Sequence, residues 1–395
     1  MPVALWVYTQ VCAVLTGIHR LVIQRTQHQI ADQKRLAKRE EQAWDNFVLV
    51  SCSFSGAVLG ALTGIMFGLY GVPHVKATFW PWITLDAVIQ FIGLIEATAA
   101  FKTRANLSSL VSLGAFLPAV QSILGLWWRS EVLSIPQWVG IALVCVGLWL
   151  NRPDGESTSA SQTKRPVPVA SKWRLVRIYN WTQATPRRQY RISIATWPFG
   201  AFALKPALAS ISSDTPAKPF LGAFILLGTM VVLAAVLCLC VQRVTERRAS
   251  ERQPFRRTVR TAAQLVWQDI ADRTTLTLFA LGGGIVGAQQ FFDLMAYAIG
   301  KVAVVACLTE TQILYNIPLS LLFPKVERWL KWALKRILRR LRGRRLESGL
   351  APEIEPATGS DPGPEQEQEL TIRTGVAAVI VTVGALLIGN VAALL

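Results

Sequence analysis

Three carboxyl side chains lie inside long apolar stretches of the sequence: Glu310, Asp293 and Glu96. An ionisable group in bilayer hydrocarbon costs at least about 2.5–3.5 kcal/mol on insertion scales, so such groups usually face a cavity and take part in function. A carboxyl group in that setting can bind a polar or cationic ligand, or carry a proton. We predict that Glu310 is the main substrate- or proton-binding residue. Asp293 and Glu96 either join it or hydrogen-bond one helix to another.

Amide and aromatic side chains gather on the same apolar stretches. Each of them alone would usually be a packing residue, and only their grouping indicates that they line a cavity. The predicted cavity-lining residues are Gln90, Gln121, Gln289, Gln290, Tyr297, Gln312, Tyr315 and Asn316.

Other charged residues have less distinctive settings. Asp86 lies beside Trp80 near the start of an apolar run, which predicts a position at the membrane interface. Lys205 lies within an apolar run, where it can pair with an acid or extend to the surface. His19 and Arg20 lie where the first apolar run ends.

The residue types of enzymatic catalysis or of a metal site form no recognisable pattern. The three histidines are His19, His28 and His74, and no nucleophile is paired with a base. All six cysteines lie in apolar runs, where a thiol acts as a small hydrophobe. Cys238 and Cys240 lack the two-residue gap and the companion histidine of a zinc site. We therefore predict no catalytic, metal-binding or cofactor-binding residue.

The elements that must position these residues are membrane-spanning helices. The chain has 395 residues, of which 52% are hydrophobic and 16% are charged, whereas soluble chains carry about a quarter charged residues. Apolar runs of roughly 20 residues match a helix that crosses about 30 Å of hydrocarbon. The ten predicted spans are residues 3–23, 47–72, 79–101, 105–128, 136–151, 191–211, 220–241, 275–299, 302–323 and 372–394.

The basic residues are distributed as ten spans require. Of the 41 Lys and Arg residues, only four lie in the second, fourth, sixth and eighth connections, which we call the even connections. These four are Lys76, Arg129, Lys218 and Lys301. Cytosolic loops are enriched in Lys and Arg, so we predict that the odd connections are cytosolic and that both termini face away from the cytosol. The same rule accounts for the net charge of +17 without a nucleic-acid partner.

Five spans on each side of a hydrophilic linker predict two halves of opposite orientation, because an odd number of spans inverts the second half. The predicted halves are residues 1–151 and 191–395, and residues 152–190 form a cytosolic linker. The expected fold is an all-α integral membrane protein of about ten transmembrane helices in two inverted five-helix repeats.

The second half contains two predicted loop insertions, at 242–274 and 324–371. Within the latter, residues 325–345 are basic and place their apolar side chains largely on one helical face, which predicts a helix on an anionic lipid surface. Residues 346–370 are acidic and rich in Pro and Gly, so we expect them to be disordered.

The fourth and fifth predicted spans carry a spaced motif. It has a proline within the fourth span, a glutamate at its end, then a glutamine and two glycines along the fifth span. Its residues are Pro118, Glu131, Gln137, Gly140 and Gly147. This pattern resembles the EamA-type half of the drug/metabolite transporter superfamily, and the resemblance implies a central cavity lined by spans three, four, eight and nine. In the second half, Leu314 stands where the pattern has a proline.

Together these features predict a multi-pass membrane transporter of a small metabolite, not an enzyme, that works by alternating access. Glu310 could carry a coupled proton. Phosphate recognition requires cations, and spans eight and nine offer only Lys301 at their turn. Neutral, zwitterionic or cationic substrates are therefore favoured over phosphorylated ones. A divalent cation such as Mg²⁺ stays open, because three carboxyl groups with amide oxygens suit a hard ion.

Two other functions stay open. A buried acid could initiate lipid or terpenoid chemistry in an integral membrane enzyme, or residues 325–370 could recruit partners to a membrane scaffold. Asn180 begins a glycosylation sequon, which the predicted orientation keeps cytosolic and unmodified. The sequence does not specify the substrate, the direction of transport or the membrane, plasma membrane or endomembrane, and it leaves a homodimer open.

Overall fold

The computed structural model of this chain describes residues 3–36, 47–101, 117–150, 186–211, 215–248, 255–270, 273–311, 314–315 and 372–388. Within these ranges almost every residue is helical, and the one extended pairing is an isolated bridge between Val75 and Ile211. The predicted all-α class is therefore confirmed for this part of the chain.

Several predicted features lie outside the described residues. They are most of the linker 152–190, the sequon at Asn180, the basic segment 325–345, the acidic segment 346–370, Gln312 and Asn316.

A helix occurs at each predicted span, wholly or in part. In chain order the helices are α1 (Val3–Leu36), α2 (Phe47–Tyr70), α3 (Phe79–Phe101), α5 (Leu117–Arg129), α6 (Ile135–Leu150), α8 (Pro186–Ala209), α9 (Ala217–Arg248), α10 (Phe255–Ile270), α11 (Arg273–Ile299), α12 (Val302–Thr309) and α14 (Ile372–Ile388). The clearest difference from the prediction is that α1 continues well past residue 23. α12 ends at Thr309, and most of the rest of the ninth predicted span lies outside the described residues.

The predicted loop insertion 242–274 is largely helical, contrary to its description as a loop. α9 extends through Arg248, and α10 occupies Phe255–Ile270. α10 packs on α9 and α11, and Arg243 of α9 donates a hydrogen bond to the Thr258 hydroxyl at 3.2 Å. The apolar residues of α10 recur with helical spacing among many charged residues, so a search for apolar runs does not detect this helix.

Among the described residues, five helices are long and apolar enough to cross a membrane: α1, α2, α3, α9 and α11. Helices α6 and α14 are also apolar but shorter. Large apolar side chains such as Leu69 of α2, Trp127 of α5 and Val232 of α9 are exposed on the outside of the bundle. Broad apolar surface of this kind is unusual on a protein in water, and it fits a protein surrounded by lipid.

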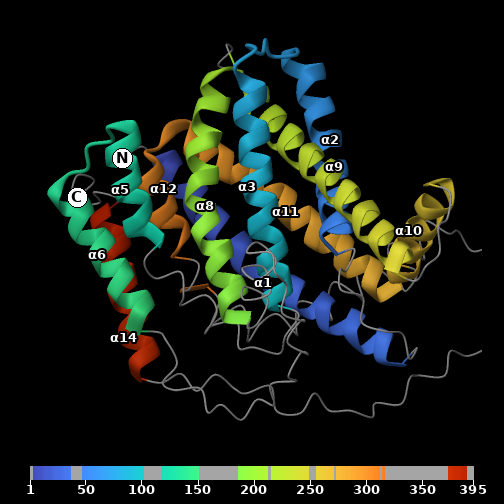
Figure 1. Cartoon of the computed structure of the whole chain (residues 1–395). Coiled ribbons are helices and arrows are strands. Elements are labelled where there is room, and N and C mark those ends of the chain that lie inside the picture. The colour runs from blue at the N-terminus through green and yellow to red at the C-terminus, as the bar shows by residue number, and fades with distance from the viewer. Residues whose placement is uncertain are drawn as a thin grey trace, which may run out of the picture.

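The helices pack in a few extensive pairs. The largest contacts join α3 to α8, α6 to α14, α1 to α11 and α2 to α9, followed by α2 with α11, α3 with α9, and α5 with α12. Helices α6 and α14 lie at one side of the bundle and α2, α9 and α10 at the other, with α3 and α8 between them (Figure 1).

The even connections meet at one end of the bundle. The backbone N–H of Lys76 donates to the carbonyl oxygen of Ser210 at 3.0 Å, and the hydroxyls of Thr78 and Ser210 lie 2.9 Å apart. These contacts join the second connection to the end of α8. We call this end of the bundle the even side.

Glycine allows α6 and α14 to cross at backbone contact. A Cβ atom at Gly140 would lie 2.5 Å from the carbonyl oxygen of Gly384, and one at Gly384 would lie 2.7 Å from the carbonyl oxygen of Gly140. Small residues at such crossings permit the close packing that joins helices in lipid. This contact gives the motif glycine Gly140 a structural reason.

Candidate functional site

Asp86, which the sequence places at the membrane interface, is fully buried between α3 and α8. Its Oδ1 accepts a hydrogen bond from the Gln90 side-chain amide at 2.9 Å. A Cβ atom at Gly200 of α8 would lie 2.9 Å from the same oxygen. Oδ2 is buried and has no hydrogen-bond partner among the described residues. Asp86 lies about two helical turns inside α3, and the neighbouring helix covers it, which the local sequence does not reveal.

Asp293 lies at the contact between α11 and α1. The Cys12 thiol of α1 lies 3.8 Å from Oδ1 of Asp293 and can donate to it. Asp293 is about two turns from the end of α11 at Ile299, and Asp86 is about two turns from the start of α3 at Phe79. Since both helix ends are at the even side, the two carboxyl groups lie at similar depth.

Glu310 is buried and lies directly after the last residue of α12. α12 ends at Thr309, and Glu310 is the C-cap residue, with its backbone N–H donating to Ala306 at 3.1 Å. The Thr311 hydroxyl donates to the carbonyl oxygen of Leu308 at 2.6 Å. Side-chain bonds of this kind offer the backbone an alternative to the helix, and they accompany the break here.

Some of the predicted cavity-lining side chains form hydrogen bonds with other described residues, and others have a buried polar atom without such a bond. Gln90 binds Asp86, and the Tyr315 hydroxyl donates to the side-chain oxygen of Gln10 on α1 at 2.7 Å. The side-chain oxygens of Gln121, Gln289 and Gln290 are buried without a hydrogen-bond partner among the described residues. Glu96 and Tyr297 are buried on α3 and α11.

The carboxyl groups do not converge as a metal site. Within the described part of the chain, no three His, Cys, Asp or Glu side chains lie where they could hold a metal ion. The Mg²⁺ alternative relied on Glu310, Asp293 and Glu96 acting together, and no such grouping occurs among the described residues.

Arg20 is an interior residue, although the sequence predicts that it lies at the end of the first span. Because α1 continues to Leu36, Arg20 lies within the helix and not at its end, and only 4% of its surface is exposed. Its guanidinium lies over the Trp197 ring of α8, 5.7 Å from the ring centre. The signal that could have found it is the helical spacing of Thr16, Arg20 and Ile23, which are buried together.

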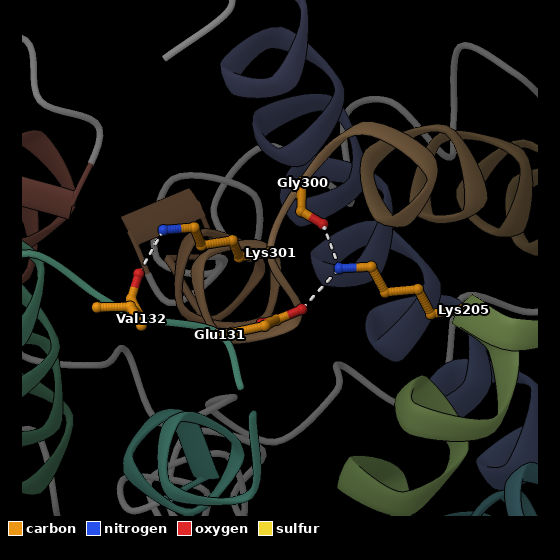
Figure 2. Close-up of polar contacts among 5 residues, drawn as sticks. All are labelled: Glu131, Val132, Lys205, Gly300 and Lys301. Carbon is orange, nitrogen blue, oxygen red and sulfur yellow. Dashed lines mark hydrogen bonds and ion pairs between the residues drawn. The ribbon is translucent and has the colours of Figure 1, made fainter. Parts of the chain in front are cut away.

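A second polar group, which we call the rim cluster, lies at the even side and consists of Glu131, Val132, Lys205, Gly300 and Lys301 (Figure 2). The Lys205 ammonium donates to Oε1 of Glu131 at 2.6 Å and to the carbonyl oxygen of Gly300 at 3.2 Å. The Lys301 ammonium donates to the carbonyl oxygen of Val132. Of the two alternatives predicted for Lys205, pairing with an acid is the one observed.

The turn between α5 and α6 positions Glu131. Ser130 has a φ of 53°, in the left-handed region that often ends helices. The Glu131 backbone N–H then donates to the carbonyl oxygen of Gly125 at 3.1 Å. The side chain is 7% exposed and faces Lys205, which is 32% exposed. The turn therefore holds the motif glutamate where it meets a cation from the other half of the chain.

Comparison with known proteins adds little to this geometry. The chain matches no protein-family model and no curated protein. It is similar to a solved structure described as "Crystal structure of protein", with a TM-score of 0.47 and 13% sequence identity over 95% of each chain. Similarity at this level identifies neither a family nor a function.

Proposed function

We propose that this chain is a multi-pass membrane transporter that moves a small metabolite by alternating access between two inverted five-helix halves, α1–α6 and α8–α14. The proposed architecture and the motif from Pro118 to Gly147 resemble the EamA-type drug/metabolite transporters. The odd connections are taken to be cytosolic, as the basic residues predict.

The observation that carries this proposal is the pattern of helix contacts. If the halves are repeats, α1, α2, α3, α5 and α6 correspond to α8, α9, α11, α12 and α14. Exchanging the halves then converts the α3–α8 contact into α11–α1, and α3–α9 into α11–α2. The contacts α2–α9, α5–α12 and α6–α14 convert into themselves. Two inverted repeats related by a pseudo-two-fold axis are expected to pack in this way.

The polar interior supports a binding site between the halves. Asp86 and Gln90 lie at the α3–α8 contact, and Asp293 and Cys12 lie at the α1–α11 contact. These are the two contacts that the exchange interconverts. In transporters of this type the substrate binds near the midplane where the repeats meet, often beside an interrupted helix, and α12 ends at the buried Glu310.

The rim cluster supports a barrier on the even side. Glu131 and Val132 belong to the first half, whereas Lys205, Gly300 and Lys301 belong to the second. Their hydrogen bonds tie the halves together at this end. In the proposed mechanism these bonds break when the halves rock apart toward the even side, and they re-form when the site opens toward the odd connections.

The test compares sealed vesicles that contain wild type or Glu310→Gln, loaded with a cell metabolite extract, with and without a pH gradient. Wild type is expected to move a compound, faster with the gradient. Glu310→Gln keeps the shape of the side chain but cannot release a proton, so it is expected to lose the acceleration by the gradient.

Two outcomes contradict parts of this proposal. If Glu310→Gln moves the compound with an unchanged response to the gradient, Glu310 does not carry a coupled proton. If wild type moves nothing but converts a compound into a product of different mass, the chain is an integral membrane enzyme. Empty vesicles control for leakage.

A further inference from the structure

Arg20 lies on the buried face of α1, which packs against α11, α12 and α3. Buried polar residues recur along this face with helical spacing. They are Thr9, Thr16, Arg20 and Gln27. A charged side chain so enclosed in a helix bundle is rare and usually faces a partner or a pathway.

The hydrogen-bonding capacity of the Arg20 guanidinium is not fully used by the described residues. The cation–π contact with Trp197 supplies an attractive partner for the positive charge, but the five N–H donors of the guanidinium still need hydrogen-bond acceptors. Its Nη1 atom is buried and has no hydrogen-bond partner among the described residues. A buried guanidinium with an unused donor is unfavourable, so the site is suited to an anion that the described residues do not supply.

The surroundings of Arg20 hold it in place and leave other polar atoms unpartnered. A Cβ atom at Gly93 of α3 would lie 2.8 Å from the Trp197 indole nitrogen, so the glycine lets the indole pack closely against α3. Next to Arg20 in sequence, His19 has a buried Nε2 without a hydrogen-bond partner among the described residues. His19 also lies beside Gln289 of α11, whose side-chain oxygen is likewise unpartnered in the described part of the chain.

An acidic group lies along the same helix pair. Asp86 is about two turns of α3 from Gly93, and its Oδ2 is also buried without a partner among the described residues. Gly93 and Asp86 are thus separated by about 10 Å along α3. The guanidinium of Arg20, from α1, contacts Trp197, which packs on Gly93, so a cation near one level of α3 and a carboxyl group at the other each have unused hydrogen-bonding capacity.

We propose that Arg20 binds an anionic group of the transported substrate, a carboxylate or a phosphate, and that the other end of the substrate lies toward Asp86. This inference rests on the proposed transport function and adds the charge of the substrate to it. A planar guanidinium can bind either oxyanion through two parallel hydrogen bonds. Of the neutral, zwitterionic and cationic classes favoured by the sequence, only the zwitterionic class contains such a group.

The test uses vesicles loaded with a cell metabolite extract supplemented with leucine, pyruvate, glucose 6-phosphate, choline and glucose. Mass spectrometry identifies which compounds wild type moves. These compounds are expected to carry an anionic group, and movement of leucine or pyruvate against glucose 6-phosphate distinguishes carboxylate from phosphate. Arg20→Gln is expected to raise the apparent Kd for the compound that wild type moves by about 10- to 100-fold. This is the usual effect on affinity of losing hydrogen bonds to a charged group. Arg25→Gln, at an exposed position on the same helix, should bind as wild type.

Arg20→Lys keeps the charge but loses the planar fork, and it carries the test if Arg20→Gln does not fold. It is expected to bind several-fold more weakly than wild type. The inference is overturned if wild type moves only compounds without an anionic group, or if Arg20→Gln or Arg20→Lys binds an anionic compound as wild type does. In both cases transport itself stands. If wild type moves nothing, the proposed function fails, and this inference fails with it.

Discussion

The rim cluster and the interior site differ in their ion pairs: among the described residues, Lys205 and Glu131 form one at the rim, whereas Arg20 and Asp86 form none. At the rim, the Lys205 ammonium binds both Oε1 of Glu131 and a backbone carbonyl, and Lys301 binds another carbonyl, although Oε2 of Glu131 is buried without a hydrogen-bond partner among the described residues. In the interior, Arg20 and Asp86 each retain a buried atom without a hydrogen-bond partner among the described residues. Both groups lie at contacts between the first and second halves of the chain.

This difference separates a structural role from a binding role. Buried polar groups in folded proteins are nearly always hydrogen-bonded, and exceptions call for an explanation such as a ligand. Paired charges at the rim can hold the two halves together without any other molecule. Unpaired groups in the interior lower the stability of the empty protein, and they are expected where a substrate completes the hydrogen bonds.

The largest expected effect on stability comes from Lys205→Met at the rim. This change leaves the buried Glu131 carboxylate without its cation, because Lys205 is its ion-pair partner. Removing one partner of a mostly buried pair is expected to cost about 2–3 kcal/mol. Thermal unfolding in detergent should show the loss as a lower midpoint temperature.

Two further variants control for this prediction. Glu131→Leu in the Lys205→Met background removes the stranded carboxylate and should recover part of the stability. Lys218→Met alters another even-side lysine, at the start of α9, and should change stability by no more than about 0.5 kcal/mol. Equal losses for Lys205→Met and Lys218→Met would mean that the rim pairing does not stabilise the protein.

The intermediate effect is expected from Asp86→Asn in the interior. Asparagine fills the same volume and keeps an oxygen that can accept from Gln90, so stability should stay within about 1 kcal/mol of wild type. Transport of the compound moved by wild type should nevertheless fall strongly, because the substrate loses a binding group. A stability loss as large as that of Lys205→Met would assign Asp86 a structural role and remove the contrast between the two regions.

The helices were predictable because apolar runs of membrane length are a strong local signal. The predicted bounds of α3, 79–101, agree with the structure, and the start of α2 at Phe47 agrees as well. Helix ends next to charged residues were less predictable. Hydropathy alone ends the first span near Arg20, whereas α1 continues because neighbouring helices cover the polar face of α1.

The candidate site was predictable in part. Glu310, Asp293 and Glu96 were found because a carboxyl group in an apolar run is unusual, and Glu310 and Glu96 are buried in the structure. The burial of Asp86 and the pairing of Lys205 depend on residues far away in the sequence. Gly200 lies against Asp86 and Glu131 binds Lys205, and no pattern within one span encodes such contacts.

The smallest expected effect comes from Lys301→Ala at the edge of the rim. The hydrogen bond from Lys301 to the Val132 carbonyl is exposed, so its loss should change stability by no more than about 1 kcal/mol, because water can replace the donor. If the rim bonds break in each transport cycle, this variant should open more easily and exchange substrate about as fast as wild type or faster. Unfolding temperature and the initial exchange rate in vesicles measure the two effects. A loss of stability equal to that of Lys205→Met would show that the exposed and the buried rim contacts stabilise the protein equally. The burial of Glu131 would then not explain the stabilising effect of its ion pair.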